Sequence, residues 1–505
     1  MSNVRSTLVS SLALFACAFI TLFLLTADVF HPSMDEGIYL EGASRVVTGQ
    51  VPYRDFFAYT GPLIYWLQAL LEMVFGRNLP MLRLSVALSF GLCTAGVCAM
   101  VSMLRGWRPG VVAGLVFFGL TSYSLYRFTI GHRWLSAGLF SVAAVLALHA
   151  LLPLKHRSRV AFGAGFFAAA AAWATPTFVV PMALILLWFP LRAREQDGRR
   201  QGLFYLAGAV AASLPAAAWL IAHGALVPMF DNLVWASSSY RRANTVWYGY
   251  YPGFKLTAGI RHMANQFRLG LPALLIPICL VLAMVEVWRR KRTGAEELLA
   301  VIALGMFLTS YPRWDVNQLL YVTMPFYALI AVWIHDVPVA SFGRAVATAS
   351  LIVSAAFGSF LTQQVDSFTY FDTRVGRLRH VPESGLALEA LEKRILPRAS
   401  ILVFPYMPVL SWALDGRNVT SYSYLQPGMM SAEDERRMLA QLKANPPDYI
   451  LRQYLPDEQV LTVWPNSDPA RMDFNSIEQF MMDGYEDVDR IRALNFDIRV
   501  LVRAR

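Results

Sequence analysis

The sequence predicts a helical multi-pass membrane protein with about eleven transmembrane helices, followed by a small extracytoplasmic α/β domain. Of its 505 residues, 56% are hydrophobic and only 15% are charged, which is too apolar for an ordinary soluble protein. Apolar windows long enough to cross a bilayer recur up to about residue 365, and after Gln363 the composition becomes charged and mixed. We therefore divide the chain into a membrane domain, 1–365, and an α/β domain, 366–505.

The apolar windows lie near residues 8–29, 81–104, 110–126, 134–153, 160–175, 176–190, 202–223, 270–288, 296–311, 318–335 and 345–362. The pair within 160–190 can also be read as one broken span. A cleaved signal peptide is an alternative for the first window, but its apolar run continues past Ala18 and many spans follow. The four cysteines all lie inside apolar runs, which is typical of buried small residues rather than of a disulfide set.

Charge distribution predicts the orientation, because short cytoplasmic loops retain Lys and Arg. With the N-terminus inside, basic residues fall in alternate short loops on the same side, at 105–108, 155–159, 192–200, 289–292 and 344. The long loops 31–80 and 224–269 and the C-terminal domain then face outward. These loops explain most of the net charge of +10, and no nucleic-acid-binding motif accompanies it, although attraction to anionic membrane lipids remains open.

The first outward loop, 31–80, carries two adjacent carboxylates where the first apolar run ends. Acids so close to hydrocarbon are costly unless water, a partner or a substrate meets them. Ser33 and Glu36 have the spacing of a capping box at the start of a short helix that Gly49 ends. Asp35 is then the carboxylate left to act as a base, with Glu36 beside it as a second candidate catalytic acid.

Further along this loop come Gly49-x-x-Pro52-Tyr53-x-Asp55 and Gly61-Pro62-Leu63, then an aromatic-rich helix from Ile64 to Phe75. Over residues 33–65 the segment resembles the first extracytoplasmic loop of polyprenol-dependent glycosyltransferases of the GT-C superfamily. It is most similar to the bacterial relatives of protein O-mannosyltransferases (glycosyltransferase family 39) and of lipid A aminoarabinose transferase. The resemblance implies a bacterial inner-membrane enzyme, a hexosyl- or pentosyltransferase, that takes its sugar from a polyprenyl phosphate and inverts the anomeric centre.

Such an enzyme needs a base for the acceptor and cations for the departing phosphate. We predict Asp35 as the base, and Asp55 as a residue that orients the acceptor or Asp35, although Asp55 is equally suited to pairing locally with Arg54. Candidate phosphate-binding residues occur in the outward loops, and the alternative is that they simply extend to the water at the membrane interface. They are Arg54, His132, Arg133, Arg241, Arg242, Lys255 and Arg313.

The Tyr311–Gln318 connection is also similar to the family pattern, in which a Pro-Arg pair precedes a span with a Leu-Pro element. Here the element is Met324-Pro325, and Asn317 stands where the family often has histidine. Asp35, Glu36 and Asp55 could supply oxygens to a divalent metal, but no spacing requires one.

The main alternative is a transporter or flippase for a lipid-linked saccharide. Transporters place ionisable residues near the middle of the membrane in broken helices, whereas here the acids gather in outward loops. A polysaccharide polymerase or ligase also remains open. The acceptor, whether glycan, lipid or protein, is left open as well.

Overall fold

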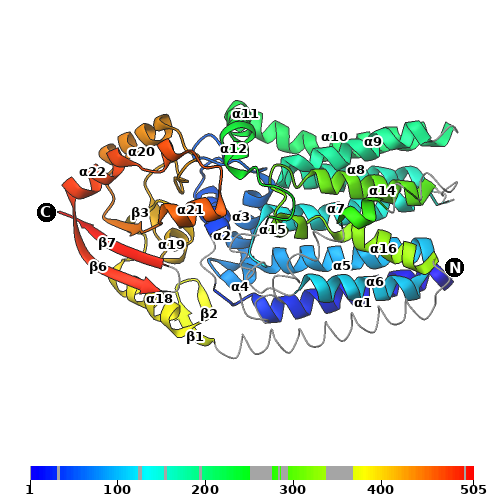
Figure 1. Ribbon diagram of the computed structural model, residues 1–505, viewed down its shortest axis with the longest axis horizontal. Coiled ribbons are helices and arrows are strands. Elements are labelled where there is room, and N and C mark those ends of the chain that lie inside the picture. The colour runs from blue at the N-terminus through cyan, green and yellow to red at the C-terminus, as the bar shows by residue number, and fades with distance from the viewer. Residues whose placement is uncertain are drawn as a thin grey trace.

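The computed structural model describes residues 2–30, 34–122, 128–152, 156–192, 196–250, 276–281, 285, 294–336, 368–493 and 496–504. Long helices lie side by side in a bundle at one end of the molecule, and a sheet domain lies at the other (Figure 1). Short helices fill the junction between these two parts. The N-terminus lies at the end of the bundle farthest from the sheet domain (Figure 1).

The bundle is built from helices whose side chains are apolar on most faces. Its members are α1 (Ser2–Thr26), α5 (Leu84–Arg105), α6 (Trp107–Thr121), α7 (His132–His149), α8 (Arg157–Ala174), α9 (Val179–Arg192), α10 (Gln196–Ala222), α14 (Gly294–Leu308) and α16 (Met324–Asp336). They match the predicted windows. The window at 270–288 is described only as helix at 276–281 and 285, and the window at 345–362 lies outside the described residues.

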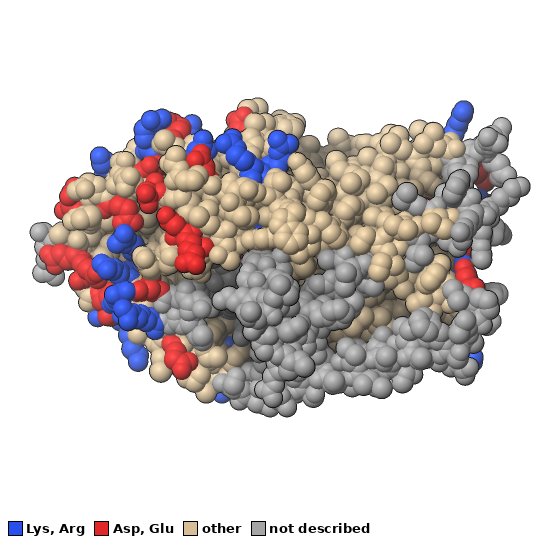
Figure 2. All heavy atoms as spheres, in the orientation of Figure 1, with Lys and Arg blue, Asp and Glu red and all other residues tan. Residues whose placement is uncertain are grey.

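Three stretches among the described residues are long and apolar enough to cross a membrane on length and composition, namely Arg5–Thr26, Leu79–Arg105 and Asp197–Ala222. The face seen in Figure 2 has a broad zone over the bundle without charged side chains. Charged residues gather instead over the sheet domain and the adjoining loops (Figure 2). This distribution is that of a protein whose bundle lies in hydrocarbon.

The 160–190 window forms two helices, α8 and α9, separated by a short 3₁₀ turn, η2 (Pro176–Phe178). Thr175 is extended, with φ −134° and ψ 109°, as expected of a residue before proline. The carbonyl of Ala174 accepts a hydrogen bond from the Gly61 amide at 3.2 Å. Gly61 is required for this approach, because a Cβ there would lie 1.9 Å from the carbonyl oxygen of Trp173.

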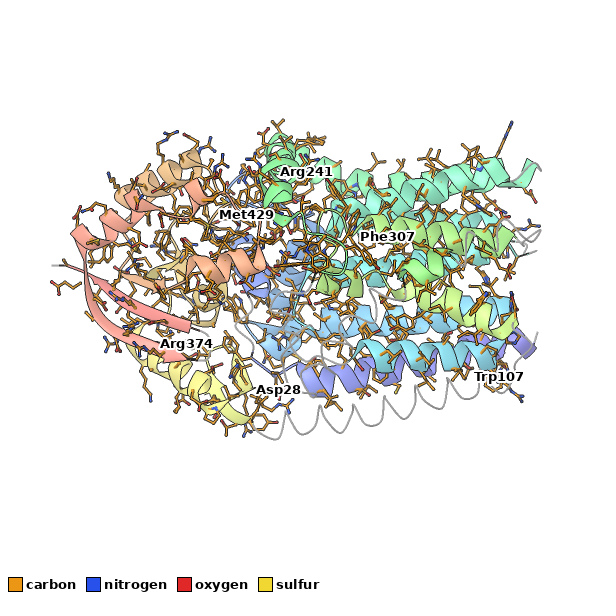
Figure 3. All side chains as sticks on the ribbon, in the orientation of Figure 1. Asp28, Trp107, Arg241, Phe307, Arg374 and Met429 are labelled. Atoms are coloured by element: carbon orange, nitrogen blue, oxygen red, sulfur yellow. The ribbon has the colours of Figure 1, made fainter. Side chains whose placement is uncertain are left out.

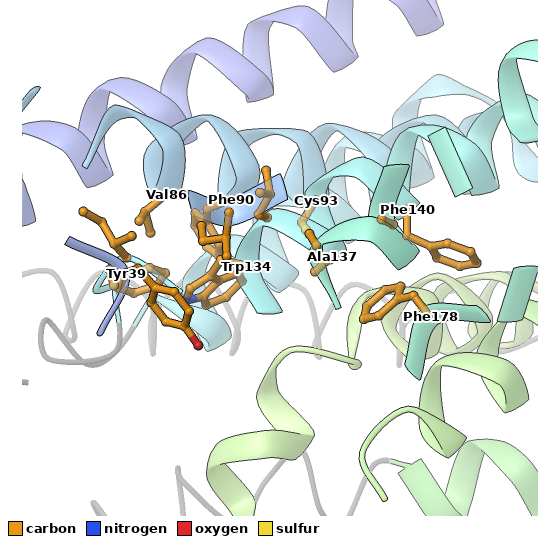
Figure 4. Packing of buried hydrophobic residues seen from close by; sticks show 14 of the residues in the cluster. Tyr39, Val86, Phe90, Cys93, Trp134, Ala137, Phe140 and Phe178 are labelled. Carbon is orange, nitrogen blue, oxygen red and sulfur yellow. The ribbon is translucent and has the colours of Figure 1, made fainter. Parts of the chain in front are cut away.

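The bundle core pairs aromatic rings with small residues. Phe90 of α5 meets Trp134 of α7 edge-on, with ring centroids 5.5 Å apart, and Phe140 contacts Phe178 in the same way at 5.6 Å (Figure 4). Glycine allows close helix contact here, because a Cβ at Gly138 would lie 2.7 Å from the Cα of Ser89. These contacts fix the start of α7, where His132 and Arg133 lie.

The junction contains the predicted first outward loop. The elements of the junction are α2 (Met34–Val47), α3 (Leu63–Phe75), α4 (Leu79–Leu82), α11 (Leu226–Trp235), the π-helix η3 (Ala236–Tyr240), α12 (Arg241–Asn244) and α15 (Val316–Leu320). The short helix predicted before Gly49 is α2, and Gly49 follows it with φ +90°. Leu70, Met73 and Val74 of α3 are exposed, as expected of a helix that lies at a membrane interface.

The C-terminal part is a sheet domain with helices. Its elements are β1 (Thr369–Thr373), β2 (Gly376–His380), α18 (Pro382–Arg394), β3 (Ser400–Phe404), α19 (Pro408–Ala413), β4 (Arg417–Asn418), α20 (Ala432–Ala444), β5 (Tyr449–Gln453), α21 (Asp457–Val463), η4 (Pro469–Arg471), α22 (Asn475–Gly484), β6 (Tyr485–Ala493) and β7 (Phe496–Arg503). The strands of the main sheet have the order β4-β3-β5-β7-β6. An α/β domain was predicted for this part of the chain, and its main sheet has β3, β5 and β7 at the centre and β4 and β6 at the edges.

Two of the contacts that join the sheet domain to the rest of the molecule involve the end of α1 and the start of α2. Arg379 of β2 pairs with Asp28 at 2.5 Å, and its backbone exchanges hydrogen bonds with Asp28 and Phe30 at the end of α1. Asp28 is labelled at this boundary in Figure 3. The second contact is between α2 and α19, where a Cβ at Gly37 would lie 2.1 Å from the Val409 amide nitrogen. The start of α2 is therefore held directly against the C-terminal domain.

Candidate functional site

Asp35 and Glu36 are adjacent acids at the start of α2, and their side chains lie in different surroundings. Glu36 is fully buried and receives hydrogen bonds from Arg83 at 2.8 and 2.6 Å and from the Ile130 amide at 2.9 Å. Arg83 also donates to the carbonyl of Thr26 at 2.8 Å. Glu36 thus connects α2 with α1, α5 and the 128–131 turn, and it does not line the cavity described next. Its predicted capping partner, Ser33, lies outside the described residues.

Asp35 faces a cavity of about 420 Å³ between the bundle and the sheet domain. Protein surrounds its carboxylate, yet solvent reaches the side chain through this cavity. Both parts of the molecule contribute to the wall. The lining residues are Asp35, Tyr39, Tyr59, Thr129, Ile130, Gly131, His132, Arg133, Tyr240, Asn244, Arg313, Asp315, Asn317, Gln318, Tyr321, Tyr406, Gln426, Val463 and Trp464.

The surroundings of Asp35 are suited to a proton acceptor. Burial raises the pKa of its carboxyl above the usual value, while the charge of Arg313, a hydrogen bond from Tyr406 and the charge of Arg133 act in the opposite direction. Desolvation wins, so the carboxylate is more basic than an exposed aspartate. The nearby cations limit this effect, and such a balance is typical of catalytic bases.

Arg313 is held by three separate elements. Its Nε pairs with Asp315, one Nη donates to Asn244 Oδ1 at 3.0 Å, and the other donates to the Val463 carbonyl at 2.9 Å. Asp315 in turn caps α15 by accepting from the Gln318 amide at 2.8 Å. The guanidinium is therefore fixed in position before any ligand arrives, which is the arrangement expected of an anion-binding group.

The first residues of α7 form another side of the cavity. The Nδ1 of His132 and the hydroxyl of Tyr39 lie 2.5 Å apart, and Arg133 donates to the Thr309 carbonyl at 3.4 Å. The backbone of His132 is fixed by Thr175, whose hydroxyl donates to the His132 carbonyl at 3.2 Å. The break between α8 and α9 thus supports this side of the site.

Other predicted residues lie elsewhere. Arg54 and Asp55 form a bidentate pair at 2.8 Å on the surface, as in the local interpretation, and neither lines the cavity. This pair lowers the pKa of the Asp55 carboxyl, because the guanidinium stabilises its charge. Arg241 and Arg242 are exposed on α12, and neither lines the cavity. Lys255 lies outside the described residues.

Sequence reasoning missed many lining residues, among them all four from the C-terminal domain. Tyr406 follows the end of β3, and Gln426 and Trp464 lie in loops after β4 and α21. The available signal was the end of a parallel strand, because ligands often bind at the carboxyl edge of such strands. Tyr240 and Asn244 come from the predicted arginine-containing segment, so that segment does reach the site through different side chains.

The carboxylates considered as metal donors are not brought together. Asp35 faces the cavity, Glu36 forms a buried ion pair with Arg83, and Asp55 pairs with Arg54 on the surface. Within the described part of the chain, no three His, Cys, Asp or Glu side chains converge as a metal-binding group.

A second cavity of about 230 Å³ lies beside the first and has an apolar wall. It is formed by the 53–62 loop with residues of α8, α9, α10 and α11, among them Trp173, Met182 and Leu233. Tyr59 borders the first cavity and Thr60 the second, so one loop separates a charged space from an apolar one.

Two solved structures have an architecture similar to that of this chain. ArnT from Cupriavidus metallidurans, solved with undecaprenyl phosphate bound, matches with a TM-score of 0.60 and 13% identity, covering 98% of this chain and 97% of ArnT. The archaeal oligosaccharyltransferase AglB from Archaeoglobus fulgidus, solved with an inhibitory peptide and a dolichol-phosphate, matches with a TM-score of 0.54 and 11% identity, covering 94% of this chain and 72% of AglB. Both belong to the GT-C superfamily.

This chain has the GT-C fold. No family model and no curated protein sequence matches it. At these identities the likeness establishes the fold, and it agrees with the resemblance of residues 33–65. In the GT-C fold seen here, the acidic helix α2, the start of α7 and the 311–318 connection meet at the boundary between bundle and sheet domain.

Proposed function

We propose that this GT-C protein transfers a sugar from a polyprenyl-phosphate donor to an acceptor on the extracytoplasmic face of a bacterial inner membrane. The observation that carries the proposal is one cavity in which Asp35 lies with Arg133 and Arg313 at the end of an apolar bundle. A polyprenyl-phosphate sugar has its tail in the bilayer and its anomeric carbon just outside. It therefore requires a base and a phosphate-binding site at this depth.

In the proposed reaction the acceptor attacks the anomeric carbon and gives its proton to the Asp35 carboxylate. The bond from the acceptor to the anomeric carbon forms as the bond from that carbon to the phosphate oxygen breaks. The electron pair leaves with the polyprenyl phosphate, whose charge Arg133 and Arg313 stabilise. Attack opposite the leaving group inverts the anomeric centre. We assign this role to Asp35 because, of the predicted catalytic acids, it is the one that lines the cavity.

The apolar cavity offers a lipid chain a place beside the charged site. Its wall contains Trp173, Met182 and Leu233, and the 53–62 loop separates it from the charged cavity. In this proposal, about eleven spans cross the membrane. The N-terminus is cytoplasmic and the 366–505 domain is extracytoplasmic. This orientation agrees with the position of Trp107, which belongs to the basic 105–108 segment. Figure 3 shows Trp107 at the end of the bundle remote from the sheet domain.

The decisive experiment compares the wild type with Asp35→Asn, purified into lipid and supplied with labelled undecaprenyl-phosphate sugars and candidate acceptors. We expect transfer to fall by at least about a hundredfold, with binding of undecaprenyl phosphate retained. Asp55→Asn serves as the matched control, because that carboxylate pairs with Arg54 at the surface. Equal transfer by wild type and Asp35→Asn would remove Asp35 from the mechanism. Movement of the lipid-linked sugar across the bilayer without transfer would favour the flippase alternative.

A further inference from the structure

Three side-chain amides on two walls of the Asp35 cavity have polar atoms without a hydrogen-bond partner. They are Asn317 Oδ1 and Gln318 Oε1 on the bundle side and Gln426 Nε2 on the sheet-domain side, and all three atoms are buried. The Gln426 side chain is only 3% exposed. A buried polar atom left unpaired costs about 1 to 3 kcal/mol, so three in one cavity indicate that a ligand completes them.

Both walls are held in place by other contacts. On the bundle side, Asp315 caps α15 and is itself paired with Arg313, which fixes the turn that bears Asn317 and Gln318. On the opposite side, the Gln426 carbonyl accepts from the Met429 amide at 3.2 Å. The neighbouring Leu425 amide donates to the Pro405 carbonyl at 2.8 Å. The amides are therefore positioned before a ligand arrives, as a specific binding site requires.

The unpaired atoms are of both kinds, two acceptors and one donor. An ammonium group can only donate and a carboxylate can only accept, so each would leave part of this set unsatisfied. Hydroxyl groups donate and accept, and a ring bearing several hydroxyls can satisfy the whole set.

The acidic residues on the wall give a further argument against an ammonium group. Among the described lining residues the acids are Asp35 and Asp315. Asp315 uses one oxygen on Arg313 and the other on the Gln318 amide. An ammonium group on the sugar would therefore meet no carboxylate except the proposed base, which Tyr406 already contacts.

We propose that Asn317, Gln318 and Gln426 form a recognition site for a neutral, hydroxyl-bearing donor sugar, and that the site discriminates against amino sugars and uronic acids. This inference rests on the proposed function, because it assigns the sugar-binding part of the same cavity. It makes Gln426 a specificity-determining residue supplied by the C-terminal domain.

The test measures dissociation constants for the intact chain in lipid nanodiscs, without an acceptor. The probes are undecaprenyl phosphate alone, its glucose, galactose and mannose conjugates, a 4-amino-4-deoxy sugar conjugate and a glucuronate conjugate. We expect the best neutral conjugate to bind at least about tenfold more tightly than bare undecaprenyl phosphate. The amino and uronate conjugates should bind no more tightly than the bare lipid.

Gln426→Met and Gln318→Met should each reduce that advantage to about threefold or less, with binding of the bare lipid unchanged. Two variants on opposite walls keep the test informative if one fails to fold. Gln453→Met is the matched control, since Gln453 is also buried with an unpartnered Oε1 but does not line the cavity.

The outcomes separate this inference from the proposed function. Tighter binding of the amino or uronate conjugate, an unchanged advantage in both methionine variants, or equal binding of bare and neutral-sugar lipids would overturn the amide site alone. Failure of the wild type to bind bare undecaprenyl phosphate would overturn the proposed function and this inference with it.

Discussion

The hydroxyl of Tyr406, in the C-terminal domain, donates a hydrogen bond to the carboxylate of Asp35 at the start of α2. The residue that we propose as the base is therefore positioned by a side chain from the other half of the molecule. The tight contact between Gly37 and α19 holds the two halves together beside this bond.

Tyr406→Phe should move the acid limb of the pH–activity profile to higher pH. The base must be ionised, so activity is lost as pH falls through its pKa. The Tyr406 hydrogen bond lowers the Asp35 pKa that burial raises, and its removal therefore raises that pKa further. We expect a loss of about threefold to tenfold in kcat at neutral pH, measured across a pH series.

Tyr424→Phe is the matched control for this measurement. Tyr424 is equally buried and packs against Tyr406, but its hydroxyl has no partner and it does not line the cavity. An acid limb that stays in place for Tyr406→Phe, or moves equally in both variants, would contradict the assigned bond.

Asp35→Asn and Glu36→Gln should have opposite effects on stability at neutral pH. The folded-state pKa of Asp35 is raised, so its contribution to stability is present at low pH and is lost as pH rises through that pKa. A neutral asparagine avoids the cost of the buried charge. Glu36→Gln leaves Arg83 without its buried counter-charge and should cost about 3 kcal/mol or more.

Thermal unfolding of both variants in the same detergent measures this contrast. The unfolding midpoint should be unchanged or higher for Asp35→Asn and clearly lower for Glu36→Gln. A large loss of stability in Asp35→Asn alone would mean that the two acids have exchanged roles.

Arg133→Gln should weaken binding of bare undecaprenyl phosphate by about tenfold or more. The guanidinium lines the cavity and its charge acts on Asp35, whereas its hydrogen bond to the Thr309 carbonyl is long at 3.4 Å. Arg241→Gln is the control, because that exposed arginine lies outside the cavity. Equal losses in the two variants would point to a general attraction of basic residues for the lipid.

Gly37→Ala should separate α2 from α19. The added methyl would lie 2.1 Å from the Val409 nitrogen, and neither backbone can yield easily. We expect a loss of about 1 to 3 kcal/mol or more, together with faster proteolysis between the bundle and the sheet domain. Gly163→Ala is the control, since its methyl would meet only the end of the Leu146 side chain at 3.3 Å. Similar proteolysis of both variants would argue against this contact as the connection.

Much of the architecture follows from local sequence patterns. Apolar windows predict helices such as α5 and α10 because a bilayer admits only segments that satisfy their own backbone. The 160–190 window can be read from the sequence as a pair of spans or as one broken span, and the structure forms two helices there with Pro176 between them. The centre of the C-terminal sheet was predictable from the apolar strands β3, β5 and β7, whereas β6 carries several charges and gave no such pattern.

A site residue could be predicted only where its neighbours in the sequence indicated its role. Asp35 was identified because a charge stands beside an apolar run, and Arg313 because it lies in a short outward turn. Glu36 and Asp55 carry the same carboxyl group, and only their partners, Arg83 and Arg54, distinguish them from Asp35. Gln426 and Tyr406 could not be found in this way, because their positions depend on how a distant domain packs.

The wall shared by the two halves of the molecule has a consequence for protein engineering. A chimera that grafts a relative's 366–505 segment onto this bundle would import a different set of sugar contacts while keeping Asp35, Arg133 and Arg313. Under the proposed amide site, such a hybrid would combine Gln426 or its replacement from one parent with Asn317 and Gln318 from the other. The residue at position 406, which contacts the proposed base, would also come with the grafted segment. Donor preference in these hybrids would therefore measure how far the C-terminal half sets the choice of sugar.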